Sequence, residues 1–198
     1  MTDVAIIDSG GANLASLEFA LARLAASSCV TSDAAVIRAA PRVLLPGVGS
    51  AGAAMQRLRE RGLAQLIPTL TQPLLGICLG MQLLYETSEE DATSGLAILP
   101  GQIRRLSPAA GLPVPHMGWN QLVPRTADPL LSGVSATDYL YFVHSYAAPV
   151  TQATLATTDY GQPFSSAVRT GNFWGTQFHP ERSGRSGARI LDNFLRLC

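Results

Sequence analysis

Short apolar runs alternate with helical patterns through the first half of the chain. Each apolar run is followed by a segment with helical spacing, and the pairs are residues 4–7 and 14–26, 43–45 and 51–61, and 74–77 and 79–85. Repeated strand and helix units of this kind are typical of an α/β fold around a parallel sheet. Because each strand ends at a turn with glycine or a helix-capping residue, the following loops should gather along one sheet edge, where sites in such folds lie.

The pattern changes after residue 96 to short strands separated by glycine, proline and asparagine. These strands are predicted at residues 98–99, 102–106, 139–143, 164–169 and 173–178. Antiparallel pairing is expected here, and residues 170–172 (Thr-Gly-Asn) indicate a hairpin turn between the last two strands.

A final helix is predicted at residues 186–197, where Ile190, Leu191, Phe194 and Leu197 recur at helical spacing and should cover one face of the sheet. The whole pattern predicts a three-layer, doubly wound α/β fold, with a mostly parallel central sheet and an antiparallel extension.

Composition favours one globular domain that spans residues 1–198. The chain has 198 residues, is 47% hydrophobic, and carries 14 basic and 14 acidic residues without a strong basic cluster. A nucleic-acid partner is therefore not expected. Since no apolar stretch approaches about 18 residues and no targeting pattern precedes the first strand, we expect a cytoplasmic protein that does not bind membranes.

The three cysteines are Cys29, Cys78 and Cys198, which are widely spaced and form no CxxC pair. No histidine lies near enough in the sequence to complete a zinc set. We expect neither a disulfide framework nor a metal site, and no cofactor.

Cys78 lies in Gly-Ile-Cys-Leu-Gly at residues 76–80, between an apolar strand and a helical pattern. This arrangement is typical of a nucleophile on a sharp turn from strand to helix, with cysteine in place of serine. The flanking glycines remove side chains that would collide in a tight bend, and a helix beginning at Leu79 would favour a thiolate. A buried structural cysteine is the alternative for this segment taken alone.

His179 and Glu181 supply what a thiolate needs in order to cleave an amide. The departing amine must be protonated by a general acid, and a second group must orient that acid. His179 follows a predicted strand, and Glu181 is two residues away and can orient the ring. His116 and His144 have no carboxylate at this spacing, so as isolated residues they are expected to be structural.

Oxyanion donors are expected on either side of the nucleophile turn. One is the backbone N–H of Leu79, directly after Cys78. The other is the loop Pro-Gly-Val-Gly-Ser at residues 46–50, in which the glycines that flank Val48 would let a peptide plane turn toward the site. An ordinary tight turn explains this loop equally well, and Val48 and Gly49 therefore stay candidates.

Three segments, at residues 46–49, 76–80 and 178–181, together resemble the class I glutamine amidotransferases in order and spacing. Four further stretches are similar to the glutaminase subunits of imidazole glycerol phosphate synthases, which act in histidine biosynthesis. These stretches are residues 11–14, 81–86, 116–120 and 141–146, of which His-Met-Gly-Trp-Asn at 116–120 is the most discriminating.

The resemblance implies a Cys78, His179 and Glu181 triad that hydrolyses glutamine to glutamate and ammonia through a thioester. It also implies that the glutamine site contains Gly47, Gln82, Glu90, His144, Ser145 and Tyr146. From the residues alone, Gln82 would be an exposed helix residue and Glu90 part of a solvated loop.

The resemblance further implies a separate (β/α)8-barrel cyclase subunit as the partner in a heterodimer. Ammonia would pass to it through a channel and be added to a phosphoribulosyl formimino nucleotide, which gives imidazole glycerol phosphate and aminoimidazole carboxamide ribotide. Asn13, Trp119 and Arg182 are the candidates for coupling or interface roles, although core packing explains Trp119 equally well.

The chain departs from the family at two positions. Ser9 stands where an aromatic residue is frequent, and Arg182 stands where lysine commonly follows the histidine, proline and glutamate. Arginine keeps the charge but not the geometry of a lysine, so a salt bridge made by that lysine is in doubt. The alternatives are another class I amidotransferase subunit, a reactive-thiol stress protein on a related sheet, and an inactive scaffold that only binds the cyclase.

Overall fold

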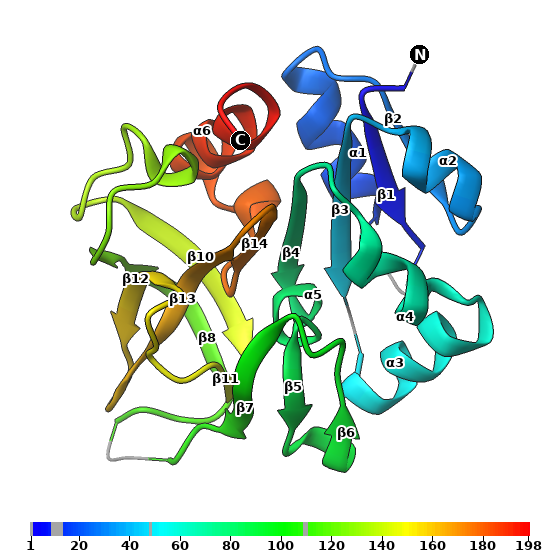
Figure 1. Cartoon of the computed structure of the whole chain (residues 1–198). Coiled ribbons are helices and arrows are strands. Elements are labelled where there is room, and N and C mark those ends of the chain that lie inside the picture. The colour runs from blue at the N-terminus through cyan, green and yellow to red at the C-terminus, as the bar shows by residue number, and fades with distance from the viewer. Residues whose placement is uncertain (1, 9–13, 48, 109–110) are drawn as a thin grey trace.

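The computed structural model describes residues 2–8, 14–47, 49–108 and 111–198. In this part of the chain eight strands form the central sheet, in the spatial order β2 (Ser28–Thr31), β1 (Val4–Ile7), β3 (Arg42–Gly47), β4 (Leu74–Cys78), β14 (Phe173–Thr176), β13 (Pro163–Thr170), β12 (Thr154–Asp159) and β9 (Val123–Pro124). The first five strands in this order run parallel, and the last three pair antiparallel. Figure 1 shows both halves of the sheet. The predicted mostly parallel sheet with an antiparallel extension is therefore confirmed.

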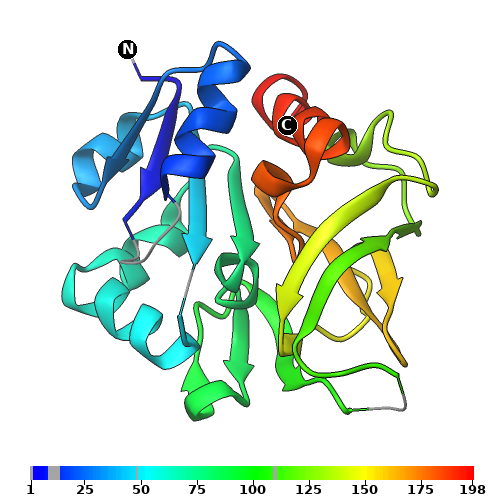
Figure 2. The same ribbon diagram turned by 180° about the vertical axis from the view of Figure 1, so that it is seen from behind.

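Two smaller sheets accompany the central one in the described residues. One contains β11 (Tyr146–Ala147), β7 (Leu99–Arg105), β5 (Tyr85–Ser88) and β6 (Thr93–Ser94). The other is a two-stranded antiparallel ribbon of β8 (His116–Gln121) and β10 (Tyr139–His144), which lies beside α6 in Figure 2.

Antiparallel pairing throughout the second half was the wrong prediction. β14 pairs parallel with β4, and β7 pairs parallel with β5, because in each case the residues between the two strands carry the chain back to the start of the neighbouring strand. The predicted strands at 98–99 and 102–106 are also one strand, β7. By contrast, the predicted hairpin is present, since Thr170 of β13 pairs with Phe173 of β14.

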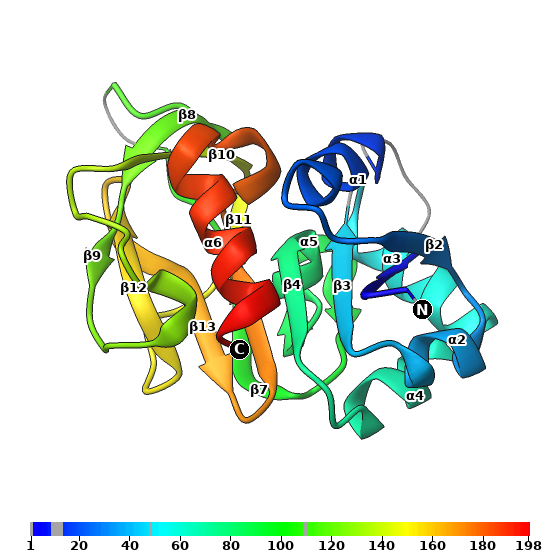
Figure 3. The same cartoon turned by 90° about the horizontal axis from the view of Figure 1, so that it is seen from above.

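Helices cover both faces of the sheet, which gives the three predicted layers. The helices are α1 (Leu14–Arg23), α2 (Ala34–Ala39), α3 (Ala51–Glu60), α4 (Leu63–Leu66), α5 (Leu79–Gln82) and α6 (Gly184–Arg196), with 3-10 turns η1 (Ile67–Thr69), η2 (Glu90–Ala92), η3 (Pro129–Leu131) and η4 (Pro180–Arg182). In Figure 3, α1 and α6 lie on one side of the parallel strands, and α2, α3 and α4 lie on the other.

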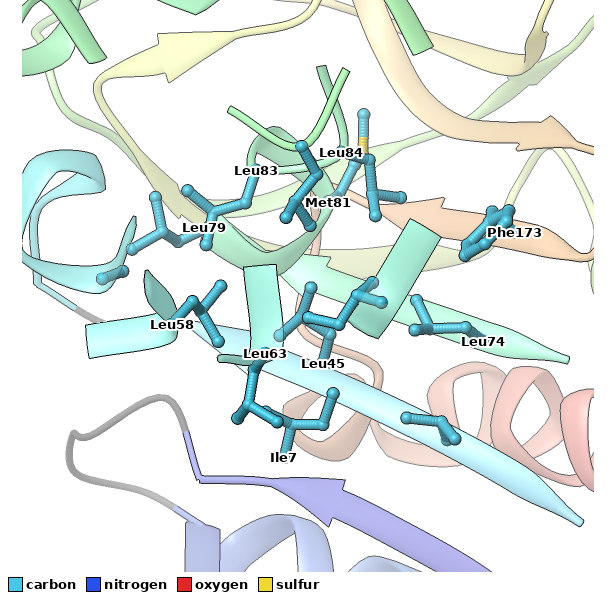
Figure 4. Packing of buried hydrophobic residues seen from close by; sticks show 14 of the residues in the cluster. Ile7, Leu45, Leu58, Leu63, Leu74, Leu79, Met81, Leu83, Leu84 and Phe173 are labelled. Carbon is cyan, nitrogen blue, oxygen red and sulfur yellow. The ribbon is translucent and has the colours of Figure 1, made fainter. Parts of the chain in front are cut away.

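Alternating strand residues supply the two cores. Ile7 and Leu45 pack with Leu58 of α3 on one face, as Figure 4 shows, whereas Ile6 packs with Leu21 of α1 on the other. Because side chains along a strand alternate between faces, an all-apolar strand must be covered by helices on both sides.

The predicted last helix is α6, but it ends at Arg196. Ile190, Leu191 and Phe194 are buried as expected, whereas Leu197 is 55% exposed. Within the described residues, no helix has the length and apolar character needed to cross a membrane.

Candidate active site

Cys78 lies at a strained turn between β4 and α5. Its φ of 53° is in the left-handed region, which is costly for a residue with a side chain, and its side chain is buried. A Cβ on Gly80 would overlap the carbonyl oxygen of Leu45, and one on Gly76 would lie 2.7 Å from the carbonyl oxygen of Gly80. The turn therefore needs glycine on both sides of the cysteine, as the sequence indicated.

Helix α5 is shorter than the helical pattern at residues 79–85 suggested. It comprises Leu79–Gln82, and the chain enters strand β5 at Tyr85. A single helical turn has a small macrodipole, so the expected stabilisation of a thiolate by this helix is correspondingly limited. Polar contacts to the sulfur matter more at this site.

Strand β14 brings the histidine segment to the cysteine. Thr176 pairs with Ile77 of β4, so the residues that follow β14 lie beside the nucleophile turn. His179 and Glu181 are joined by a hydrogen bond of 2.8 Å between Nδ1 and Oε1. The parallel pairing thus gathers Cys78, His179 and Glu181 from segments about a hundred residues apart.

The surroundings of His179 favour its protonated form. Burial disfavours the imidazolium, but hydrogen bonds to the Cys78 sulfur and the Glu181 carboxylate, together with their charges, raise the pKa of His179 to about 10. A protonated ring beside a thiolate can donate a proton to a leaving amine.

Gln177 is a contact of Cys78 that the sequence patterns did not indicate. Its Nε2 donates to the Cys78 sulfur at 3.6 Å, and its Oε1 accepts from Gln82 Nε2 at 2.9 Å. The side chain is fully buried. The signal that could have revealed this contact in the sequence is an amide side chain at the end of an apolar strand, two residues before His179.

A cavity of about 290 Å³ is lined in part by Cys78. Its described lining residues are Gly49, Cys78, Leu79, Gln82, Glu90, Pro115, Val143, His144, Ser145 and Tyr146. It brings together most of the residues that the resemblance assigned to glutamine and adds Pro115 and Val143. Gly47 is not part of this lining, but it pairs in register with Cys78 from the neighbouring strand.

The candidate oxyanion loop begins at Gly47, where a Cβ would lie 2.7 Å from the backbone nitrogen of Gly80. Gly49 has a φ of 84°, which favours glycine, and lines the cavity. Val48 lies outside the described residues. Of the predicted oxyanion donors that the structure describes, Leu79 and Gly49 therefore both line the cavity.

Gln82 and Glu90 differ from what the residues alone indicated. Gln82 is buried, and its Nε2 donates to the Tyr146 carbonyl at 2.7 Å, so its assignment as an exposed helix residue was wrong. Glu90 is half-buried and its Oε2 accepts from the backbone N–H of Ala51 at 2.8 Å. The pKa of Glu90 is raised above its usual value. Burial is the main cause, the hydrogen bond from the N–H of Ala51 opposes it, and the negative charge of Asp91 adds to it.

The two described coupling candidates lie away from the cavity. Trp119 is 55% exposed on β8 and meets Tyr141 of β10 edge to face at 5.8 Å, which excludes core packing as its explanation. The Arg182 guanidinium lies over the Tyr141 ring at 4.6 Å. Ser9 and Asn13 lie outside the described residues.

This arrangement can perform acyl transfer. A thiolate can attack a carbonyl carbon in the cavity, backbone N–H groups at the turn can stabilise the oxyanion, and an oriented imidazolium can protonate the leaving group. Within the described residues no group of three or more histidine, cysteine, aspartate or glutamate side chains could hold a metal ion.

A family model described as "Glutamine amidotransferase class-I" matches residues 5–198. The chain is 55% identical to the imidazole glycerol phosphate synthase subunit HisH of Xanthomonas euvesicatoria pv. vesicatoria (strain 85-10), with 100% of this chain and 98% of that protein covered. It is 54% identical to the subunit of the same name from Xylella fastidiosa (strain 9a5c), with the same coverage.

Solved structures support the fold. A structure described as a glutamine amidotransferase has a TM-score of 0.75 and 18% identity, with 98% of this chain and 97% of that chain covered. The structure of PurLQS from Thermotoga maritima contains a chain with a TM-score of 0.70, also at 18% identity, with 98% of both chains covered. At these identities the likeness concerns the fold alone.

Proposed function

Because the chain belongs to the class I glutamine amidotransferases and, among them, to the HisH subunits of imidazole glycerol phosphate synthase, we propose that it hydrolyses glutamine and supplies the ammonia to a synthase partner in histidine biosynthesis. The observation that carries this proposal is the 55% identity along the full chain to a HisH subunit. The contacts around Cys78 support it.

In the proposed first half-reaction, the Cys78 thiolate attacks the carbonyl carbon of the glutamine side-chain amide. The carbonyl electron pair moves to the oxygen, and this oxyanion accepts hydrogen bonds from the backbone N–H of Leu79 at the turn and from the loop that contains Gly49. The C–N bond then breaks as the His179 imidazolium gives its proton to the nitrogen. Ammonia leaves and a thioester on Cys78 remains.

In the second half-reaction, water adds to the thioester carbon while neutral His179 accepts a proton from it. The C–S bond breaks, glutamate is released, and the thiolate is restored beside an imidazolium. Glu181 keeps its hydrogen bond to Nδ1 throughout, so that the reacting nitrogen of the ring stays directed at the sulfur and the water.

The cavity offers groups for both charged ends of glutamine. Glu90 presents a carboxylate that can hold the α-ammonium group. Gln82 and the backbone of residues 144–146 line the remaining wall and can bind the α-carboxylate end.

Replacing Glu90 with glutamine is expected to raise KM for glutamine about tenfold, because a charge-assisted hydrogen bond to the α-ammonium group is lost. The amide oxygen of the introduced side chain can still accept a hydrogen bond from the N–H of Ala51, so kcat should change less than about threefold. Steady-state glutaminase kinetics measure both values. The matched control is Glu89→Gln, which removes the same charge from an exposed neighbour; an equal KM in the two variants would argue against this role.

The subunit name of the relatives implies a partner subunit in the synthase. We infer that the partner is a (β/α)8-barrel cyclase, which would use the ammonia to form imidazole glycerol phosphate and aminoimidazole carboxamide ribotide. A heterodimer follows.

The outer face of the β8–β10 ribbon is the proposed docking face. It exposes Met117, Trp119 and Tyr139, which are large apolar side chains close to the Arg182 and Tyr141 pair. Strand β10 of this ribbon also supports the active site, since the carbonyl of Tyr141 accepts a hydrogen bond from the backbone N–H of His179 at 2.9 Å. An exposed apolar face on a two-stranded ribbon is a feature of interaction surfaces.

Trp119→Ala is expected to weaken binding of the cyclase subunit about thirtyfold, as the loss of a central aromatic side chain does at protein interfaces. Titration calorimetry with the purified partner measures the dissociation constant. Val36→Ala is the control, because Val36 is also exposed but lies on α2, across the sheet from the ribbon. Similar affinity for the two variants would exclude this docking face.

The function is tested by treating the assembled complex with a glutamine-analogue diazoketone. One adduct is expected on Cys78, with Cys29 and Cys198 unmodified, and glutaminase activity should disappear in proportion. Peptide mass spectrometry locates the adduct. An active wild-type complex with Cys78 unlabelled would contradict the proposed nucleophile, and absence of glutaminase activity in the complex would favour the inactive scaffold.

A further inference from the structure

Two buried histidines that the proposed mechanism does not use form a hydrogen-bonded pair next to the site. His116 Nδ1 lies 3.0 Å from His144 Nε2, and both side chains are buried. His144 lines the site cavity, whereas His116 lies behind it. His144 is therefore part of the cavity wall, and His116 supports it from behind.

The surrounding hydrogen bonds determine which nitrogen of each ring carries the proton. His144 Nδ1 lies 2.8 Å from the Tyr146 carbonyl oxygen, which can only accept, so this nitrogen is the donor. His144 Nε2 must then accept, and His116 Nδ1 must donate to it. His116 Nε2 is left as an acceptor and faces the Asn120 amide Nδ2 at 3.4 Å. One assignment, with both rings neutral, satisfies every contact.

The neutral state follows from burial. Burial lowers the pKa of His116 to about 4. For His144, burial is again the main cause of a lowered pKa; the Tyr146 carbonyl raises the pKa, and repulsion from His116 in its protonated form and from His179 lowers it, to a value of about 3. Both rings therefore keep this pattern of donors and acceptors at neutral pH.

The pair acts on the carbonyl of Tyr146, where two donors converge. His144 Nδ1 and Gln82 Nε2 both donate to this oxygen, at 2.8 Å and 2.7 Å. Gln82 in turn donates to Gln177, whose amide contacts the Cys78 sulfur. A shift of the Tyr146 carbonyl would thus move the wall that faces the substrate and its connection to the nucleophile.

Neighbouring rings hold His116 in place on only part of its surface. It stacks between Phe142 at 4.9 Å and Tyr160 at 4.0 Å, measured between ring centroids. A second cavity of about 280 Å³, lined in part by Trp119 and Asn120, borders its other side. Because packing leaves this side of the ring open, the hydrogen bond to His144 is what fixes the orientation of the His116 ring.

We propose that His116 is a positioning residue for glutamine binding. Its Nδ1–H holds His144 in the tautomer and orientation that fix the Tyr146 carbonyl, and through it the Gln82 side chain, in the wall of the substrate cavity. This role rests on the proposed glutaminase function and extends the site to a residue that does not border the substrate cavity.

The test compares three substitutions of His116 in the assembled complex. His116→Asn keeps an amide N–H at the place of Nδ1, His116→Phe keeps the stacked ring but removes the donor, and His116→Gln moves the amide to the place of Nε2. We expect His116→Phe and His116→Gln to raise KM for glutamine about tenfold, with kcat within about twofold of wild type. His116→Asn should have a KM within about twofold of wild type.

Activity with ammonium salts serves as the control for folding and docking, and it should be unchanged in all three variants. An unchanged KM in His116→Phe and His116→Gln, an equal rise in all three variants, or a loss confined to kcat would each overturn the positioning role. If His116→Phe does not fold, the comparison of His116→Asn with His116→Gln decides the question by the same criteria. Absence of glutamine turnover in the wild-type complex would instead refute the proposed function itself.

Discussion

Cys78→Ala is expected to lower glutamine-dependent synthesis by about 10⁴-fold or more, while synthesis with added ammonium salts continues at the wild-type rate. The proposed chemistry requires a sulfur to form the thioester, and alanine cannot replace it. In the proposed division of labour the partner subunit consumes ammonia from any source, so its own reaction should be independent of Cys78. Both rates are measured in the reconstituted complex by formation of the imidazole product.

The alanine side chain also fits the turn, because Cys78 already places a Cβ there at a φ of 53°. The loss is therefore expected without a change in thermal stability or in affinity for the partner. Cys29→Ala, at a half-buried position on β2, is the matched control and should keep both activities. If Cys78→Ala lost the ammonium-dependent reaction as well, the variant would report a damaged fold or interface, and the assignment of the nucleophile would lack support.

Gly80→Ala is expected to disrupt both the fold and the site. The new methyl group would overlap the carbonyl oxygen of Leu45 and lie 2.8 Å from its carbonyl carbon, and both atoms belong to the backbone of β3. Backbone in a central strand cannot move aside without breaking the pairing with β4 that places Gly47 next to Cys78. The free energy of unfolding should fall by about 3 kcal/mol or more.

This loss corresponds to a melting temperature lower by roughly 6–12 °C for a chain of this size. Any folded fraction should show glutaminase activity reduced by about 100-fold, since a displaced nucleophile loses alignment with its substrate. Differential scanning calorimetry and glutaminase assays measure the two effects.

Gly171→Ala provides the control. Gly171 has a φ of 54°, but no heavy atom lies within 4 Å of the position that the new methyl group would take, so only the backbone strain of about 1 kcal/mol is expected. A smaller loss of stability for Gly80→Ala than for Gly171→Ala would contradict the close approach of the nucleophile turn to β3.

The proposed triad could be picked out from the sequence because its signals are local. Cys78 stands between two glycines at a junction of strand and helix, and His179 and Glu181 are two residues apart, so each requirement shows within a few positions. The parallel first half was predictable for the same reason, since apolar runs and helical spacing are local patterns.

The partners of those residues were not predictable in this way. Gln177 contacts Cys78 only because β14 inserts beside β4 in parallel, which joins segments about a hundred residues apart. Gln82 is buried only because Tyr146 and Gln177 supply partners for its amide, and an amide on a short helix gives no such indication by itself.

The sequence by itself determined the fold class and the candidate residues of the proposed nucleophile turn and triad, because sterics at glycine, hydrophobic periodicity and short-range chemistry leave direct traces in neighbouring positions. The tertiary structure alone decided which polar groups surround the sulfur and how His116 and His144 are hydrogen-bonded to one another and to the Tyr146 carbonyl. Those contacts depend on strand order and on the burial of polar groups that must find partners, and both are properties of the packed chain.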